Sequence, residues 1–170
     1  ILAALLHGED PEEINFNVIT HDSLDKSLKW DEEFPEVFEN GGFDAVVGNP
    51  PYIRIQNLED DYKKYLQNNW ASAKSGNIDI YYPFIELGLN LLNKNGRLGF
   101  ITPNSHFNTA AGKNLRKILK SNKSMYRIVN FDYIRVFQDV NVYSFVSIFT
   151  KKPNDEIKFR KMTEEVTSID

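Results

Sequence analysis

The sequence predicts an α/β protein with a mostly parallel sheet, helices on both faces of the sheet, and an antiparallel hairpin at the C-terminal end. Short apolar runs typical of buried strands alternate with stretches in which apolar residues recur at helical spacing. The last two apolar runs are separated by only about eight residues. This is too few for a crossover helix, so these two strands are expected to pair antiparallel.

The composition is that of an ordinary globular domain. Of 170 residues, 41% are hydrophobic and 26% are charged, which excludes a collagen-like or wholly disordered chain. Cysteine is absent and the three histidines are scattered, so we expect no disulfide framework and no metal site. The apolar run at residues 1–6 is too short for a membrane span and has no basic flank. We therefore expect a cytoplasmic protein.

The N-terminal third is expected to hold two short strands. They are residues 15–20 (NFNVIT) and 43–47 (FDAVV), each followed by polar loop residues. The second strand follows a Gly41-Gly42 turn. Between the strands, residues 22–40 are rich in acidic side chains and should form an irregular or partly helical connection.

Two helices are expected in the middle of the chain. The first covers residues 58–70 and is followed by a loop at residues 75–77. The second covers residues 79–93, where six apolar side chains recur at helical spacing, and Asn95-Gly96 supplies its stop.

The C-terminal half is expected to hold four strands and one amphipathic helix. The helix covers residues 109–121. The strands are residues 97–102, 126–133, 141–150 and 156–161. The last of these should form an edge strand of the sheet.

Charge is distributed unevenly along the chain, although the formal net charge is only -4. Residues 1–61 contain 15 acidic and 3 basic side chains, whereas residues 87–131 contain 8 basic side chains and no acidic one. A basic half can bind a polyanion. A helix such as residues 113–120 can equally well present a solvated basic face, and charge alone does not decide between the two.

One segment stands out chemically. Gly48-Asn49-Pro50-Pro51-Tyr52 follows the predicted strand 43–47 directly, and ligands bind at the carboxyl ends of strands in open α/β sheets. The alternative is a rigid turn, because Asn-Pro and Pro-Pro both mark turns. From average residue usage, Asn-Pro-Pro-Tyr is expected by chance in a chain of this length with odds on the order of one in two thousand.

At these residues the sequence resembles the S-adenosylmethionine-dependent amino-methyltransferases, whose catalytic motif is (Asn/Asp/Ser)-Pro-Pro-(Tyr/Phe/Trp). The asparagine form followed by Ile53 is similar to that of adenine-N6 DNA methyltransferases. Residues 79–86 (DIYYPFIE), 96–107 (GRLGFITPNSHF) and 135–138 (RVFQ) resemble restriction-modification enzymes of the gamma arrangement, in which cofactor motifs precede the catalytic one. The resemblance implies a partial Rossmann-like methyltransferase sheet, S-adenosyl-L-methionine as cofactor and double-stranded DNA as partner.

The residue types in the motif suit methylation of an amine. The exocyclic amine of adenine is a poor nucleophile, because its lone pair is delocalised into the ring. The side-chain carbonyl of Asn49 and the backbone carbonyl of Pro50 can each accept one N–H bond and turn the lone pair toward the methyl group. The Pro50-Pro51 pair keeps this backbone stiff. Tyr52 offers a ring face for an extruded base.

The resemblance also implies roles for residues outside the motif. Phe137 would stack on the other face of the base, although a phenylalanine beside Val136 can also be a core residue. Asp22 would accept a hydrogen bond from the cofactor adenine, although an Asp after a strand can also be a helix cap. Phe84 would pack against the same adenine, or else be an ordinary core residue of an amphipathic helix.

Further basic and histidine side chains are candidates of lower weight. If the chain binds DNA, Lys113, Arg116 and Lys120 are the candidates for phosphate contacts. His106 follows the predicted strand 97–102, but the reaction does not need a histidine, and we interpret it as a hydrogen-bonded loop residue.

The chain departs from the family pattern because no glycine-rich cofactor loop, and no acidic residue after a second strand, precedes Asp22. We therefore expect residues 1–152 to be the catalytic and target-base portion of a methyltransferase domain. Residues 153–170 would be an edge strand and the start of a linker. The cofactor loop and the target-recognition region would lie elsewhere in a longer protein, and this portion alone would be inactive.

Two other functions are left open by the sequence. The same motif can serve methylation of a protein glutamine amide or an RNA base amine. A non-catalytic DNA-binding or interaction module is the other alternative.

Overall fold

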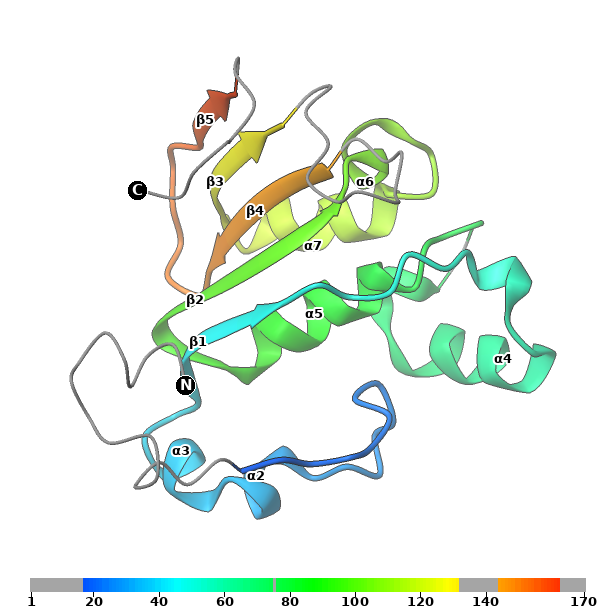
Figure 1. Cartoon of the computed structure of the whole chain (residues 1–170), viewed down its shortest axis with the longest axis vertical. Coiled ribbons are helices and arrows are strands. Elements are labelled where there is room, and N and C mark those ends of the chain that lie inside the picture. Colours follow the sequence, from blue (N-terminus) through cyan, green and yellow to red (C-terminus); the bar gives the residue numbers. More distant parts are fainter. Residues whose placement is uncertain (1–16, 75, 132–143, 163–170) are drawn as a thin grey trace.

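The structure of the chain, a computed structural model, describes residues 17–74, 76–131 and 144–162 (Figure 1). In this part of the chain a five-stranded sheet has the strand order β1-β2-β4-β3-β5. The strands are β1 (Phe43–Gly48), β2 (Leu92–Pro103), β3 (Met125–Asn130), β4 (Ser144–Thr150) and β5 (Lys158–Lys161).

The sheet combines parallel and antiparallel pairs. Strands β1 and β2 are parallel, as are β3 and β5, whereas β4 pairs antiparallel with both β2 and β3. The antiparallel hairpin predicted at the C-terminal end is therefore confirmed, with β3 and β4 as its strands. The predicted edge strand is also confirmed, because β5 lies at the end of the sheet.

Short helices connect and cover these strands. They are α2 (Trp30–Glu33), α3 (Pro35–Glu39), α4 (Asp60–Asn69), α5 (Tyr81–Leu91), α6 (Ser105–Asn108) and α7 (Lys113–Ser121), with single 3-10 turns η2 (Ile55–Asn57) and η3 (Ala71–Ala73). The predicted helices at 58–70 and 79–93 are confirmed as α4 and α5, each slightly shorter than expected. The predicted helix at 109–121 begins only at Lys113, because residues 109–112 form a turn.

The strand expected at residues 15–20 is wrong over its described part. Residues 17–20 form no strand, and no described strand pairs with the outer edge of β1. Without a neighbouring strand to complete a ladder, the backbone there has no sheet partner. The following segment instead turns at Asp22, where the amide of Asp25 donates to the Asp22 carbonyl over 3.0 Å.

Helix α5 and strand β2 form the centre of the core. Tyr81 and Tyr82 at the start of the helix are fully buried, and Gly88 lets Leu98 of β2 approach the helix closely. Burying an aliphatic side chain of this kind stabilises the fold by roughly 1.5–3 kcal/mol. Helix α5 runs from the carboxyl end of β2, where the Tyr81 hydroxyl donates to the Pro103 carbonyl over 3.2 Å, back to the amino end of the strand.

None of the helices in the described part of the chain is both long and apolar enough to cross a membrane.

Candidate active site

The Asn49-Pro50-Pro51-Tyr52 segment lies at the carboxyl edge of the parallel pair β1 and β2. Gly48, the last residue of β1, is in register with Phe100 of β2. The Tyr52 hydroxyl donates to the carbonyl of Ile101 over 2.9 Å and so fixes the segment across this edge. The sequence prediction that the motif follows the strand directly is confirmed. In Figure 1 the chain leaves β1 here and continues toward α4.

The side chain of Asn49 is held by the same hydroxyl. The Tyr52 hydroxyl lies 2.5 Å from Asn49 Oδ1, which accepts a hydrogen bond from it. A tyrosine hydroxyl carries one hydrogen, so it cannot donate fully to both Asn49 and Ile101. An amide oxygen has two lone pairs, so Asn49 Oδ1 keeps a position that can accept a second donor. Burial raises the pKa of Tyr52, which keeps the hydroxyl protonated.

Pro50 supplies a second free acceptor. Its side chain is buried, whereas Asn49 is exposed. No described residue donates a hydrogen bond to the Pro50 carbonyl. The motif therefore offers two adjacent oxygen acceptors, one from a side chain and one from the backbone, on a segment stiffened by two prolines.

A pocket of about 240 Å³ adjoins the motif. Its walls are mostly apolar and come from β1, β2, the Asn49-Pro50-Pro51-Tyr52 segment, α5 and the segment before β1. The lining residues are Ser23, Trp30, Val46, Val47, Gly48, Asn49, Pro50, Pro51, Phe84, Leu87, Gly88, Leu91 and Phe100. The structure thus brings Phe84, which the sequence nominated for cofactor binding, together with Asn49 and Pro50.

Asp22 lies beside this pocket, next to the lining residue Ser23. Its Oδ1 accepts a hydrogen bond from the Leu24 amide over 3.0 Å. Its Oδ2 accepts one from the Tyr62 hydroxyl over 2.6 Å. The side chain is exposed, so its carboxylate is oriented by protein groups while remaining open to solvent. It stabilises a turn and does not cap a helix.

A flat heterocycle with an amine fits this arrangement. The pocket offers aromatic and aliphatic walls from Trp30, Val46 and Phe84, and Asp22 directly precedes the lining residue Ser23. Apolar walls with a few fixed polar groups are typical of cofactor sites. Phe84 and Asp22 are therefore the described residues that could hold an adenine ring and its amine.

Trp30 and Tyr62 were not identified from the sequence. Trp30 falls in a stretch expected to be irregular, and Tyr62 in a polar helix. The usable signal for Tyr62 was the pair Tyr62 and Tyr65, three residues apart on a helix whose other side chains, apart from Leu66, are polar. The two rings stack in the structure, with centroids 6.2 Å apart.

A cluster of buried and partly buried polar side chains packs against Tyr52 of the motif through Tyr81. The Tyr81 hydroxyl lies 2.9 Å from Ser105 Oγ, and Ser105 donates to Asp79 Oδ2 over 3.1 Å. The Tyr81 ring meets the Tyr52 ring edge to face, with centroids 6.3 Å apart. His106 is fully buried against this cluster, and desolvation lowers its pKa to about 4. A neutral, enclosed histidine agrees with the interpretation of His106 as a structural residue.

The basic residues nominated for DNA contacts differ in their surroundings. Lys113 and Lys120 are exposed on α7. Arg116 instead uses Nη1 to donate to the carbonyls of His106 and Thr109, each over 2.7 Å. This guanidinium therefore fixes the connection between α6 and α7. Phe137 lies outside the described residues.

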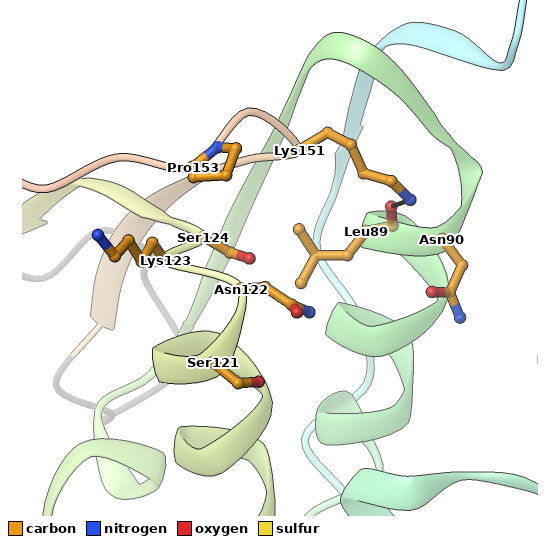
Figure 2. Close-up of a pocket in the computed structure, with 8 residues that line it drawn as sticks. All are labelled: Leu89, Asn90, Ser121, Asn122, Lys123, Ser124, Lys151 and Pro153. Carbon is orange, nitrogen blue, oxygen red and sulfur yellow. Dashed lines mark hydrogen bonds between the residues drawn. The ribbon is translucent and has the colours of Figure 1, made fainter.

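A separate pocket of about 480 Å³ lies at the opposite edge of the sheet (Figure 2). There the end of α5 meets the end of α7, and Lys151 Nζ donates to the carbonyl of Leu89 over 2.8 Å. A cation at the C-terminal end of a helix is electrostatically favourable. None of the residues nominated from the sequence lines this pocket.

Comparison with known proteins places the chain in a family. A model of the Eco57I restriction-modification methylase family matches residues 5–137. The chain is 30% identical over 182 residues to the type II restriction enzyme and methyltransferase RM.Eco57I of Escherichia coli, covering 96% of this chain and 18% of that protein. It is 34% identical over 131 residues to the type II methyltransferase M.HincII of Haemophilus influenzae, covering 76% and 25%.

A shorter match links the chain to a protein methyltransferase. It is 35% identical over 89 residues to the release factor glutamine methyltransferase of Clostridium botulinum, covering 49% of this chain and 31% of that protein.

Solved structures share the fold. The methyltransferase subunit of a type I restriction-modification system from Streptococcus thermophilus aligns with a TM-score of 0.65 and 18% identity, covering 93% of this chain and 32% of that one. The type IIL restriction-modification enzyme MmeI, in complex with DNA, aligns with a TM-score of 0.66 and 19% identity, covering 90% and 20%.

The chain spans about a fifth to a quarter of the length of the restriction-modification relatives RM.Eco57I and M.HincII. The family model, in contrast, covers most of the chain and includes the Asn49-Pro50-Pro51-Tyr52 motif, Asp22 and Phe84. The chain belongs to the Eco57I restriction-modification methylase family.

Proposed function

We propose that this chain is the catalytic portion of a DNA (adenine-N6)-methyltransferase of a restriction-modification system. The observation that carries the proposal is the pair of adjacent acceptors, the remaining lone pair of Asn49 Oδ1 and the Pro50 carbonyl, beside a pocket lined by Phe84. Two acceptors on a stiff segment suit an NH₂ group that must be methylated. Family membership supports the same conclusion.

The acceptors activate the target amine without a strong base. Each accepts one N–H bond, which draws the nitrogen out of conjugation with the ring and frees its lone pair. When bound, S-adenosyl-L-methionine supplies an electrophilic methyl group on its sulfonium sulfur and is left as a thioether. The methylated amine would release one proton, which solvent can take up. Preorganised acceptors of this kind typically account for about 10²–10³ in rate.

The target base must be turned out of the duplex to reach these acceptors. Tyr52 presents one ring face, and its orientation is fixed by Ile101 through the hydroxyl and by Tyr81 through the ring. We assign the opposite face to Phe137, on the basis of the family resemblance. Stacking on an aromatic ring contributes roughly 1–3 kcal/mol per base.

The cofactor would occupy the 240 Å³ pocket. Phe84 would pack against its adenine, and Asp22 would accept a hydrogen bond from the adenine amine. These two residues line or adjoin the same pocket as the catalytic acceptors, which is the arrangement that methyl transfer between two bound molecules requires.

DNA would be held by electrostatic contacts to its phosphates. Lys113 and Lys120 are exposed and seven residues apart on α7, so they lie on one side of that helix. Arg116 is the third residue that we propose for phosphate contact. Its Nη1 donates to backbone carbonyls of the protein, but the guanidinium has further N–H donors. The related fold of MmeI was solved in complex with DNA.

The amide of a protein glutamine is the second candidate substrate. It is favoured by the match to the release factor glutamine methyltransferase, because an amide NH₂ can donate hydrogen bonds to the same two acceptors. That match covers 49% of the chain, whereas the match to RM.Eco57I covers 96%.

A substrate comparison tests the proposal. The full-length gene product that carries this sequence is incubated with labelled S-adenosyl-L-methionine and with DNA, RNA or protein acceptors in parallel, and the products are identified by mass analysis. We expect N6-methyladenine in DNA. Label in a protein glutamine amide or in RNA would keep the chemistry of Asn49 and replace the substrate. Absence of transfer to any acceptor would favour a non-catalytic module.

A further inference from the structure

Helix α4 holds the segment that contains Asp22, although the two are about 40 residues apart in sequence. The Tyr62 hydroxyl donates to Asp22 Oδ2 over 2.6 Å, and the Tyr65 hydroxyl contacts Asp25 Oδ1 at 3.3 Å. Just beyond the helix, Trp70 Nε1 donates to the carbonyl of Leu24 over 3.2 Å. Both Leu24 and Trp70 are buried, so this hydrogen bond lies in the protein interior.

The two tyrosines have different partners. Tyr62 contacts the carboxylate of Asp22, whereas Tyr65 contacts Asp25 and accepts the amide of Lys26 over 2.5 Å. Burial together with the Asp22 charge raises the pKa of Tyr62, so its hydroxyl is a permanent donor. The hydroxyl therefore fixes Oδ2 of one specific carboxylate.

The fixed carboxylate keeps accepting capacity. Oδ1 receives the Leu24 amide and Oδ2 receives the Tyr62 hydroxyl, but each carboxylate oxygen offers about two acceptor positions. Two donors from the protein thus set the plane of the Asp22 carboxylate and leave one position per oxygen for a further donor. This is how a supporting shell normally orients a binding group.

We infer that Tyr62 is a positioning residue for the cofactor, holding Asp22 in the orientation that accepts the 6-amino group of the cofactor adenine. The inference rests on the proposed function, which gives Asp22 its ligand. It adds that recognition of the adenine amine depends on α4, a helix that begins shortly after Tyr52. The stretch of chain that follows the motif thereby holds the cofactor carboxylate.

Binding of two ligands to two phenylalanine variants tests the inference. The ligands are S-adenosylhomocysteine and its analogue with hydrogen in place of the 6-amino group, measured by calorimetry on the full-length gene product. Tyr62→Phe should weaken the binding of S-adenosylhomocysteine about five- to tenfold and leave the affinity for the analogue unchanged. The ratio of the two affinities, which measures recognition of the amine, should therefore become smaller. Tyr65→Phe is the matched control, because it removes a hydroxyl from the same helix that contacts Asp25. It should leave the preference intact.

The outcomes separate this inference from the proposed function. Equal weakening of both ligands by Tyr62→Phe, or an unchanged preference for the amine, would overturn the positioning role while the cofactor site stands. Failure of the unsubstituted protein to bind S-adenosylhomocysteine would overturn the cofactor site and the role of Tyr62 together. Melting curves of both variants check that each remains folded, which we expect because each keeps its ring.

Discussion

His106 shows how burial can dominate the behaviour of a single residue. Its Nε2 atom is buried without a hydrogen-bond partner in the described residues, and its Nδ1 atom lies 3.2 Å from both the Pro103 carbonyl and the Tyr81 hydroxyl. Desolvation lowers its pKa to about 4, well below the usual value of 6.5. The ring is therefore neutral wherever the protein is folded near neutral pH.

The lowered pKa of His106 predicts a pH dependence of stability. The unfolded state takes up a proton below about pH 6.5, and the folded state only near pH 4, so stability is fully present above pH 6.5 and is lost as the pH falls through this window. The contribution is about 3 kcal/mol. Denaturant unfolding at pH 7, 5 and 4 should show this loss in the free energy of unfolding. In His106→Asn the free energy of unfolding should fall less over the same pH range. Parallel profiles would contradict the assignment.

The hydroxyl of Tyr52 is expected to matter separately from its ring. Tyr52→Phe keeps the ring face for stacking but removes the contacts to Asn49 and Ile101, so the Asn49 amide loses its orientation. We expect single-turnover methyl transfer to fall about tenfold in Tyr52→Phe and further in Tyr52→Ala, which also removes the ring. A Tyr52→Phe rate equal to that of the unsubstituted protein would leave no role for the hydroxyl.

At the scale of elements, helix α5 is positioned by one small residue. A Cβ atom at Gly88 would lie 2.7 Å from Leu98 Cδ1, and Leu98 is fully buried, so its side chain has little space to move. Gly88→Ala should destabilise the fold by about 1–2 kcal/mol, because overpacking outweighs the gain in helix propensity. Gly99→Ala is the control, since its Cβ would meet Ile148 at an ordinary 3.4 Å. Equal melting temperatures for the two variants would contradict this packing.

Most elements were predictable because each has a local signal. The period of apolar residues predicted α5, and the short loop predicted the antiparallel pairing of β3 and β4. The strand expected at residues 15–20 had the right composition, but no described neighbour is present to pair with it. A strand depends on its partner, so composition alone could not decide this case.

The residues of the candidate site also divide into those that a local sequence pattern revealed and those that it did not. Asn49 to Tyr52 form a contiguous motif, and Phe84 lies in a matched segment, so sequence reasoning reached both. Tyr62 contacts Asp22 across 40 positions, and Trp30 reaches the pocket from the short helix α2. Contacts of this range depend on tertiary packing, which no local pattern in the sequence records.

At the scale of the whole molecule, the uneven charge predicts salt-dependent DNA binding. Replacing both Lys113 and Lys120 by Gln should weaken binding to DNA of any sequence and lower the slope of log affinity against log salt by about 2. Lys29→Gln with Lys94→Gln is the matched control, because both side chains are exposed and neither lies on α7. An unchanged slope in the first pair would show that α7 faces away from DNA.

In the proposed mechanism, two fixed acceptors on a stiff motif activate the target amine. The most direct test is the single-turnover rate of methyl transfer to adenine in DNA by Asn49→Ala, with S-adenosylhomocysteine affinity and melting temperature measured in parallel. Asn57→Ala, an exposed asparagine a few residues beyond the motif, is the control. We predict a fall of about 10²–10³ in rate for Asn49→Ala, with affinity and stability unchanged. A rate within about twofold of the unsubstituted protein would contradict the account.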